Sequence, residues 1–262
     1  MVPLILGWER LPKSYSVHGD TSDTVLVEPV PAVLLDTEAG WVLLDTGMNT
    51  ALIRDRALRE RLHGRNHAIV PILPDGDGDG AGAGEPLEHA LASHGLALSD
   101  ITHIHLSHLH NDHAGGLRLF ARSVPVTVQR RELEYGLSDH PFPERHGMFR
   151  IDFDDPDIDW RLIDGDVELA PGIRTIFTPG HTPGHQSFVV DLPGGAGYVL
   201  AFDAADLREN LERGRPPGGF VHCRAEDALA SMLRLERIAA ETGYPIIPGH
   251  DPHVWAALTD GR

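Results

Sequence analysis

The sequence predicts a mixed α/β fold, and three observations favour this class. Short runs rich in valine and leucine alternate along the chain with segments whose apolar residues recur at helical spacing. Clusters of polar residues follow directly after several of the apolar runs, where α/β proteins usually place their sites. The length of 262 residues, of which 41% are hydrophobic, allows a sizeable buried core in one large domain or two small ones.

The first half of the chain is expected to contain a hairpin, a helix and two further strands. Residues 24–36 and 40–47 are rich in Val and Leu and are separated by the turn-like sequence TEAG, which predicts a hairpin. Residues 85–96 have apolar residues at helical spacing and a glycine near the end, which predicts a helix. A strand over residues 100–108 and a strand that runs into a short helix over residues 124–136 follow.

The second half is expected to contain three strands and one long helix. Residues 172–181 and 197–206 are apolar runs that end at polar residues, and residues 244–251 form a last short strand and loop. Residues 225–243 predict a helix that ends at a glycine. Four of its apolar side chains are expected to share one face: Leu229, Met232, Leu233 and Ile238.

The segment DGDGDGAGAG, residues 75–84, is expected to be a flexible Gly/Asp loop, because a glycine-rich tract cannot pack. Its alternating aspartates also resemble the start of a calcium-binding loop. That pattern requires Glu at its twelfth position, which here is Pro86, and Glu85 misses the position by one residue. We therefore favour the flexible loop.

A long loop over residues 137–159 is expected to shape a substrate pocket. Phe142, Met148 and Phe149 either line that pocket or pack on the protein's own core.

Composition excludes several classes of partner. A formal net charge of −17 argues against a nucleic-acid backbone or an anionic membrane, and fits a neutral or cationic small molecule better. Cys223 is the one cysteine, so no internal disulfide forms. The apolar run at the N-terminus is too short for a signal peptide, and no run approaches transmembrane length. A cytoplasmic protein is expected.

The segment HLHNDHAGG, residues 108–116, predicts a metal centre. Alternate side chains of an extended segment point the same way, so His108 and His110 are expected to converge on one ion. Asp112 and His113 follow a bend and are placed to face a second ion nearby. Imidazole and carboxylate ligands suit zinc, with iron, manganese or cobalt as alternatives. A histidine-rich surface loop would explain neither the spacing nor the two glycines.

Three later segments supply further ligands. His181 lies on a Pro-Gly turn after a strand and is placed to complete the ion of His108 and His110. Asp203 ends an apolar strand, where its carboxylate either bridges two cations or forms a turn. His250 in the last loop is expected to bind the second ion.

Four more residues are expected to support the site or the strand that leads to it. His185 is expected to orient a ligand through its ring N–H. Asp45, in LLDTG, is expected to support a ligand with its carboxylate or to form a turn. His103 and His105 are expected to belong to the strand itself.

These segments resemble, in this order, the metallo-β-lactamase superfamily: LLDTG, HLHNDHAGG, TPGHTPGHQS, AFDAAD and IIPGHD. Within it they are most similar to the N-acyl homoserine lactonases, the quorum-quenching branch. The likeness runs from about residue 33 to residue 251. It implies a four-layer αββα sandwich, with residues 1–262 as a single domain, two zinc ions at one edge, and a homodimer.

The resemblance assigns the ligands to two sites. It implies that His108, His110 and His181 bind the first zinc, that Asp112, His113 and His250 bind the second, and that Asp203 bridges them. Two ions ~3.5–4 Å apart share a hydroxide that is nucleophilic near neutral pH. The implied reaction is attack of this hydroxide on the carbonyl of a lactone, with Asp112 and Asp203 as catalytic carboxylates and Asp112 passing the proton on.

One position departs from the lactonase pattern. These lactonases carry a tyrosine three residues after the bridging aspartate, where it donates a hydrogen bond to the substrate, and here that residue is Asp206. An ionised carboxylate accepts hydrogen bonds and cannot donate. Either Asp206 is protonated, or another donor such as His222 or Tyr135 replaces the tyrosine, or the substrate differs.

Several functions share the metal pattern. Hydrolysis of another ester, a thioester or a phosphotriester on the same site is an alternative, as is iron-dependent redox chemistry. A protein that binds metal without turnover is a third class. Nucleases of the superfamily usually carry a basic face or a large insert, whereas this chain is acidic and short between Asp203 and His250.

Overall fold

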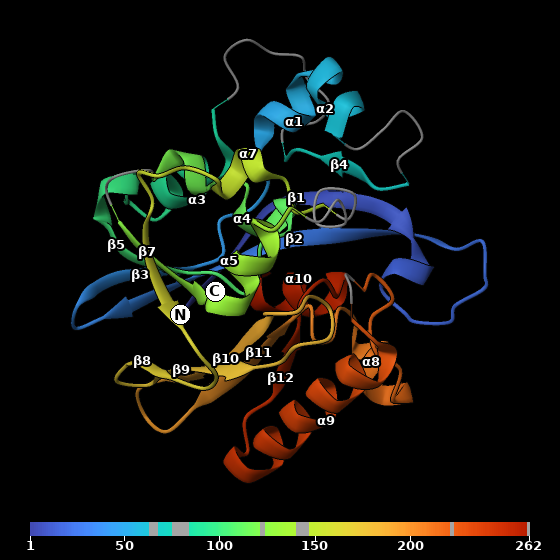
Figure 1. The fold of residues 1–262 in the computed structure, drawn as a ribbon. Coiled ribbons are helices and arrows are strands. Elements are labelled where there is room, and N and C mark those ends of the chain that lie inside the picture. The colour runs from blue at the N-terminus through green and yellow to red at the C-terminus, as the bar shows by residue number, and fades with distance from the viewer. Residues whose placement is uncertain (63–67, 75–83, 121–123, 140–146, 221–222, 261–262) are drawn as a thin grey trace.

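The computed structural model describes residues 1–62, 68–74, 84–120, 124–139, 147–220 and 223–260. Within these residues the chain forms two mixed sheets packed face to face, with helices on both outer surfaces (Figure 1). The layers follow the order helix, sheet, sheet, helix, which confirms the expected αββα sandwich. The predicted Gly/Asp loop and its calcium alternative fall on residues 75–84, which lie outside the described residues except for Gly84.

The larger sheet has, within the described residues, the strand order β4-β1-β2-β3-β5-β6-β7. β1, β2 and β3 are antiparallel neighbours, as are β1 and β4, whereas β3, β5, β6 and β7 run parallel. Its strands are β1 (Val2–Pro12), β2 (Val25–Thr37), β3 (Gly40–Leu44), β4 (Val70–Ile72), β5 (Ile101–His105), β6 (Pro125–Gln129) and β7 (Asp159–Ile163).

The smaller sheet has the order β12-β11-β10-β9-β8 among the described strands. β8 to β11 are antiparallel neighbours, and β12 runs parallel to β11. Its strands are β8 (Glu168–Ala170), β9 (Ile173–Phe177), β10 (Gln186–Asp191), β11 (Gly197–Phe202) and β12 (Ile246–Pro248).

The helices lie mainly on the outer faces: α3, α5 and α7 beside the larger sheet, and α8 and α9 beside the smaller one (Figure 1). None of the described helices is long and apolar enough to cross a membrane. The helices are α1 (Thr50–Arg54), α2 (Arg56–Leu62), α3 (Pro86–Ser93), α4 (Asn111–Ala114), α5 (Arg130–Gly136), α7 (Arg150–Phe153), α8 (Arg208–Arg213), α9 (Ala225–Thr242) and α10 (Pro252–Asp260), with 3₁₀ turns η1 (Lys13–Tyr15), η2 (Leu98–Asp100) and η3 (Leu117–Leu119).

Among the described residues, three apolar cores hold the layers together, and alternation along the strands creates them. In β2, Val33 and Leu35 face the space between the sheets, whereas Leu34 faces the outer helices. In β10, Phe188 faces the space between the sheets and Val189 faces α9. Because successive side chains of a strand point to opposite faces, each fully covered strand serves two cores at once.

The strongest sequence patterns are confirmed. β2 and β3 form the predicted antiparallel hairpin, and α9 spans most of residues 225–243. One detail is wrong, because Leu233 is 40% exposed while Met232 is fully buried. Successive helical residues are separated by about 100° around the axis, so Leu233 cannot share the buried face with Met232.

Several elements are not predicted by the sequence patterns. β1 contains charged residues at Glu9 and Arg10, which interrupt its apolar pattern. It is nevertheless a long strand, because it pairs along its length with β2. β10 directly follows the histidine-rich turn, and the short strands β4 and β8 contain only three residues each. Pairing with neighbours, rather than local composition, defines these strands.

Of the long loop over residues 137–159, the structure describes residues 137–139 and 147–159, and the buried apolar side chains of this part pack on the protein's own core. Met148 and Phe149 are almost completely buried, and Met148 belongs to the core between the larger sheet and its helices. Of the two alternatives, core packing is therefore the one found for Met148 and Phe149, and Phe142 lies outside the described residues.

We expect Met232→Ala to lower the free energy of unfolding by about 2–4 kcal/mol, because it opens a cavity between α9 and the smaller sheet. The matched control, Leu233→Ala, removes an exposed side chain of the same helix and should change stability by less than about 0.5 kcal/mol. Urea unfolding followed by circular dichroism measures both. Equal losses in the two variants would contradict this packing of α9.

Candidate metal centre

The predicted ligands gather where strands of both sheets end. The larger sheet contributes the loop after β5 and the short helix α4, and the smaller sheet contributes the residues after β9, β11 and β12. The seven predicted ligands come together here in two groups, and all seven are buried: His108, His110, Asp112, His113, His181, Asp203 and His250. Asp206, which is also buried, forms a third group with Asp203 and His250.

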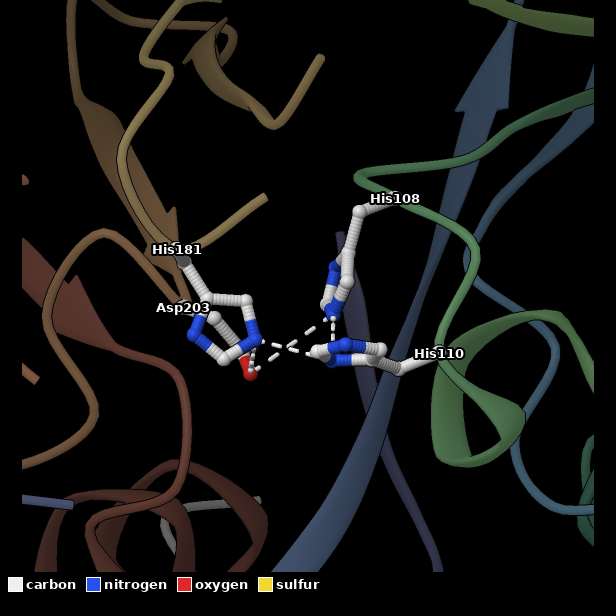
Figure 2. A group of neighbouring side chains, drawn as sticks. All are labelled: His108, His110, His181 and Asp203. Atoms are coloured by element: carbon white, nitrogen blue, oxygen red, sulfur yellow. Dashed lines mark hydrogen bonds and ion pairs between the residues drawn. The ribbon is translucent and has the colours of Figure 1, made fainter. Parts of the chain in front are cut away.

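The first group is formed by His108, His110, His181 and Asp203 (Figure 2). His110 Nδ1 lies 3.0 Å from His108 Nε2 and 2.9 Å from His181 Nε2. Asp203 Oδ2 lies 3.2 Å from His181 Nε2 and 3.7 Å from His108 Nε2. Two ligands of a tetrahedral zinc ion are about 3.3 Å apart when each bond is about 2 Å. The spacing of this group therefore fits one ion.

The second group is formed by Asp112, His113 and His250. His113 Nε2 lies 3.1 Å from Asp112 Oδ2, and His250 Nε2 lies 3.9 Å from the same oxygen. His113 Nε2 is buried and makes no hydrogen bond. A buried nitrogen without a hydrogen bond costs free energy, so its position among carboxylates fits a cation ligand.

Asp203 connects the two groups. Its Oδ2 faces the first group, while its Oδ1 lies 3.2 Å from His113 Nε2 and 3.1 Å from His250 Nε2. The residue before it, Phe202, has a φ of 46°, a left-handed conformation that non-glycine residues rarely adopt. This turn directs the carboxylate between the two groups.

His185 supports Asp203 rather than another histidine. Its Nε2 accepts a hydrogen bond from the backbone N–H of Asp203 at 3.1 Å, so its proton resides on Nδ1. Nδ1 lies 2.9 Å from Thr178 Oγ1 and 3.2 Å from the Thr178 carbonyl oxygen. His185 therefore orients the peptide of Asp203 through the lone pair of Nε2, and not through its ring N–H as expected.

Asp45 holds one histidine of each group. Its Oδ2 accepts hydrogen bonds from His113 Nδ1 at 2.7 Å and from Ser107 Oγ at 2.6 Å. Ser107 Oγ in turn lies 2.9 Å from His108 Nδ1. Protons on both Nδ1 atoms leave both Nε2 atoms as lone-pair donors that face the site. Asp45, with a φ of 59°, is also left-handed.

The two glycines of HLHNDHAGG are required by close packing. A Cβ on Gly115 would lie 2.1 Å from the backbone nitrogen of Asn49, and one on Gly116 would lie 2.3 Å from the carbonyl oxygen of Thr46. The Thr46 N–H donates to the His113 carbonyl oxygen at 2.7 Å. The glycines therefore let α4 lie against the loop that carries Asp45.

Glu132 is a buried residue of α5 that sequence patterns do not identify. Its Oε1 accepts from the N–H of Leu109, between His108 and His110. Its Oε2 accepts from Thr182 Oγ1 and from the Gly184 N–H, both at 2.8 Å. Glu132 thus ties the loop after β5 to the loop that carries His181. Burial raises the pKa of this carboxyl to about 7, while the three donors act in the opposite direction.

The first group combines neutral imidazoles with an ionised carboxylate. Burial holds the pKa of His108 and of His181 well below the usual value, so both are neutral, as metal ligation requires. Burial also opposes the charge on Asp203, but His113 and His250 outweigh it and lower the pKa of that carboxyl. Asp203 is therefore ionised and suited to bind cations.

A cavity of about 390 Å³ opens beside the two groups. Asp112, His181, Asp203 and His250 form part of its wall. Neutral side chains that donate hydrogen bonds also line it, namely Ser14, Tyr15 and Asn111. The cavity is large enough for a small-molecule substrate.

The strand histidines and Tyr135, one proposed substitute for the family tyrosine, do not belong to the metal groups or to the cavity wall. His103 and His105 lie within β5, as predicted, and burial lowers the pKa of His105 to about 3. Tyr135 packs against the core under α5 and is not part of the cavity wall. His222 lies outside the described residues. Asp206 does line the cavity.

Comparison with known proteins agrees with this geometry. Residues 25–250 match the sequence profile of the metallo-beta-lactamase superfamily. The chain belongs to this superfamily. It is 32% identical over 231 residues to the N-acyl homoserine lactonase AiiA of Bacillus thuringiensis subsp. kurstaki. The aligned region covers 88% of this chain and 84% of that protein. The predicted resemblance is thereby confirmed.

Two further relatives extend the comparison. The N-acyl homoserine lactonase AttM of Agrobacterium fabrum is 32% identical over 234 residues, 87% of this chain and 84% of that protein. A solved structure of an N-acyl homoserine lactone hydrolase, with the product N-hexanoyl-L-homoserine at its catalytic metal centre, superposes with a TM-score of 0.80. It is 31% identical and covers 96% of this chain and 93% of that one.

We expect Asp45→Asn to weaken metal binding about 10–100-fold. The amide presents an N–H₂ donor toward His113 or Ser107, which favours the tautomer with the proton on Nε2 and so removes a ligand. Competition with a fluorescent chelator measures the affinity. The control Asp36→Asn, an exposed position on β2, should bind metal like the parent. Unchanged affinity in Asp45→Asn would contradict the positioning role.

We expect Glu132→Gln to destabilise the protein by about 2–3 kcal/mol, because an amide cannot accept all three hydrogen bonds. The metal content after dialysis should fall as the two loops separate. Glu134→Gln, an exposed position on the same helix, is the matched control. Chemical unfolding and elemental analysis provide the two measurements. Full metal content and parental stability in Glu132→Gln would show that the clamp is dispensable.

Proposed function

We propose that this protein is a dinuclear zinc hydrolase that opens the ring of an N-acyl homoserine lactone or of a similar small lactone. One observation carries the proposal. The Asp203 carboxylate lies between two groups of buried histidines and aspartate, at the wall of a cavity that admits a small molecule. Relatives that match most of the chain are named N-acyl homoserine lactonases.

The two groups provide ligands for two zinc ions. His108, His110 and His181 would hold the first, Asp112, His113 and His250 the second, and Asp203 both. Imidazole nitrogens with a few carboxylate oxygens are a typical zinc donor set. When bound, such a pair of ions supplies a hydroxide nucleophile at neutral pH and polarises the carbonyl of an ester.

The chain's own residues would bind the lactone and move the proton. Asp112 lies in the cavity wall, where its carboxylate would accept the proton of the nucleophile and return it to the leaving oxygen. Tyr15 and Asn111 line the same cavity and would donate hydrogen bonds to the substrate. We infer that Tyr15 supplies the phenol that the family pattern places at the position of Asp206.

The proposal also includes the domain organisation, the cellular location and the oligomeric state of the protein. The two sheets share one core, which supports a single domain over residues 1–262. The cytoplasmic location and the homodimer expected from the sequence remain part of the proposal, to be checked by fractionation and by light scattering.

We expect the metal-loaded protein to acidify a weakly buffered solution of at least one lactone, because ring opening releases a carboxylic acid. Asp112→Asn should lose this activity by about 10²-fold or more, since an amide cannot take up the proton. Asp139→Asn, an exposed position, is the control. A pH-indicator assay over a panel of lactones measures both, with metal content determined for each sample. Equal rates in parent and Asp112→Asn would remove Asp112 from the mechanism.

Removal of the metal should abolish the activity, and addition of zinc should restore it. Elemental analysis of the freshly purified protein is expected to find two zinc ions per chain. One iron ion per chain without lactone turnover would favour the redox alternative instead.

A further inference from the structure

Three carboxylates that belong to neither the first nor the second histidine group line the cavity. They are Glu9 on β1, Glu28 on β2 and Asp206 after β11. Among the described residues that form the cavity wall, none is lysine or arginine. The part of the cavity that these carboxylates form is therefore acidic beyond the needs of metal binding.

Glu9 and Glu28 lie directly opposite each other in the antiparallel pairing of β1 with β2. Side chains of such a pair point to the same face and are close together, and like charges in this arrangement destabilise a sheet. Glu28 is 3% exposed, and its Oε1 accepts a hydrogen bond from Ser16 Oγ at 2.6 Å. Glu9 is half-buried. Two facing carboxyl groups, one buried and one half-buried, in the wall of a cavity indicate a functional requirement.

Asp206 adds a third carboxylate. It is 5% exposed, and its buried Oδ1 makes no hydrogen bond. One of its carboxylate oxygens lies within 4.8 Å of ligand atoms of Asp203 and His250. Asp206 thus lies beside Asp203 and His250 in the wall of the same cavity as the glutamate pair, and one of its oxygens is left for a ligand to satisfy.

At neutral pH the two glutamates are both ionised only beside a positive partner. Burial raises the pKa of Glu28 to about 7. Burial, the Asp112 carboxylate and Glu28 itself raise the pKa of Glu9. An ammonium group among them would offset both the desolvation and the repulsion, because buried charges are tolerated when they are paired.

We propose that Glu9, Glu28 and Asp206 form a subsite for a cationic substituent of the substrate. The substrate class is then a small lactone or ester that carries an ammonium group away from the bond that is cleaved. This inference rests on the proposed function, since it names the substrate of the same cavity. The net charge of −17 agrees with it, because a negative protein attracts cationic substrates.

The test compares substrates that differ in one charge. N-hexanoyl homoserine lactone is neutral, whereas its ω-aminohexanoyl counterpart carries an alkylammonium that stays protonated at neutral pH. Free homoserine lactone places the ammonium on the ring instead. With metal-loaded protein, we expect kcat/KM for at least one ammonium substrate to exceed that of the neutral lactone about tenfold, because charge-assisted hydrogen bonds are worth that much. Equal or lower values for both would overturn the subsite.

Substitutions identify the residues that produce the preference for the ammonium substrate. Glu9→Gln and Glu28→Gln should each bring the ratio of the two kcat/KM values toward one, through a higher KM for the ammonium substrate. Glu241→Gln, exposed on α9, should keep the parental ratio. Both Gln variants should melt at or above the parental temperature, because they remove the cross-strand repulsion. A lower melting temperature together with an unchanged ratio of the two kcat/KM values would show that the pair is structural and would contradict the proposal.

Binding separates failure of this inference from failure of the proposed function. Isothermal titration with the two ring-opened hexanoyl products measures the charge preference even if no lactone is turned over. Tighter binding of the ammonium product, lost in Glu28→Gln, supports the subsite; equal binding overturns it. A third divalent ion per chain that disappears in Asp206→Asn would also overturn it, because a metal ion would then occupy the carboxylates.

Discussion

The carboxylate of Asp203 is the interaction on which the site depends. Its two oxygens face two separate groups of imidazoles, so a single side chain connects the two groups of candidate ligands. The left-handed turn at Phe202 and the hydrogen bond from the Asp203 N–H to His185 fix its direction. The buried inter-sheet core below holds β11 in place, so the geometry of the carboxylate derives from the packing of the whole sandwich.

Around this carboxylate, two other acids organise the site without entering it. Asp45 sets the tautomers of His113 directly and of His108 through Ser107. Glu132 joins the loop of His110 to the loop of His181. Both are fully buried and satisfied by hydrogen bonds, which is the condition under which a charge is tolerated in a protein interior. Rigid placement of its ligands is what a metal site requires.

The sequence predicts the part of this arrangement that local pattern encodes. The spacing of His108, His110, Asp112 and His113 within one short segment, and the hairpin of β2 and β3, follow from neighbouring residues, and both are found. Glu132 has no such signal, because its three partners come from two distant loops. The pair of Glu9 and Glu28 depends on the register between β1 and β2, and no pattern within either strand reveals it. Long-range pairing is therefore the information that single segments lack.

The division of ligands between the two sheets has a consequence for how the molecule matures. The larger sheet brings four ligands on one short stretch, and the smaller sheet brings His181, Asp203 and His250 on three separate turns. The first and the second group each take ligands from both halves, so an ion that contacts the whole of either group binds only the docked sheets. Ions that bind only the docked form stabilise it in proportion to the logarithm of their free concentration. The cell's supply of metal would thus govern the lifetime of the assembled sandwich as well as its chemistry.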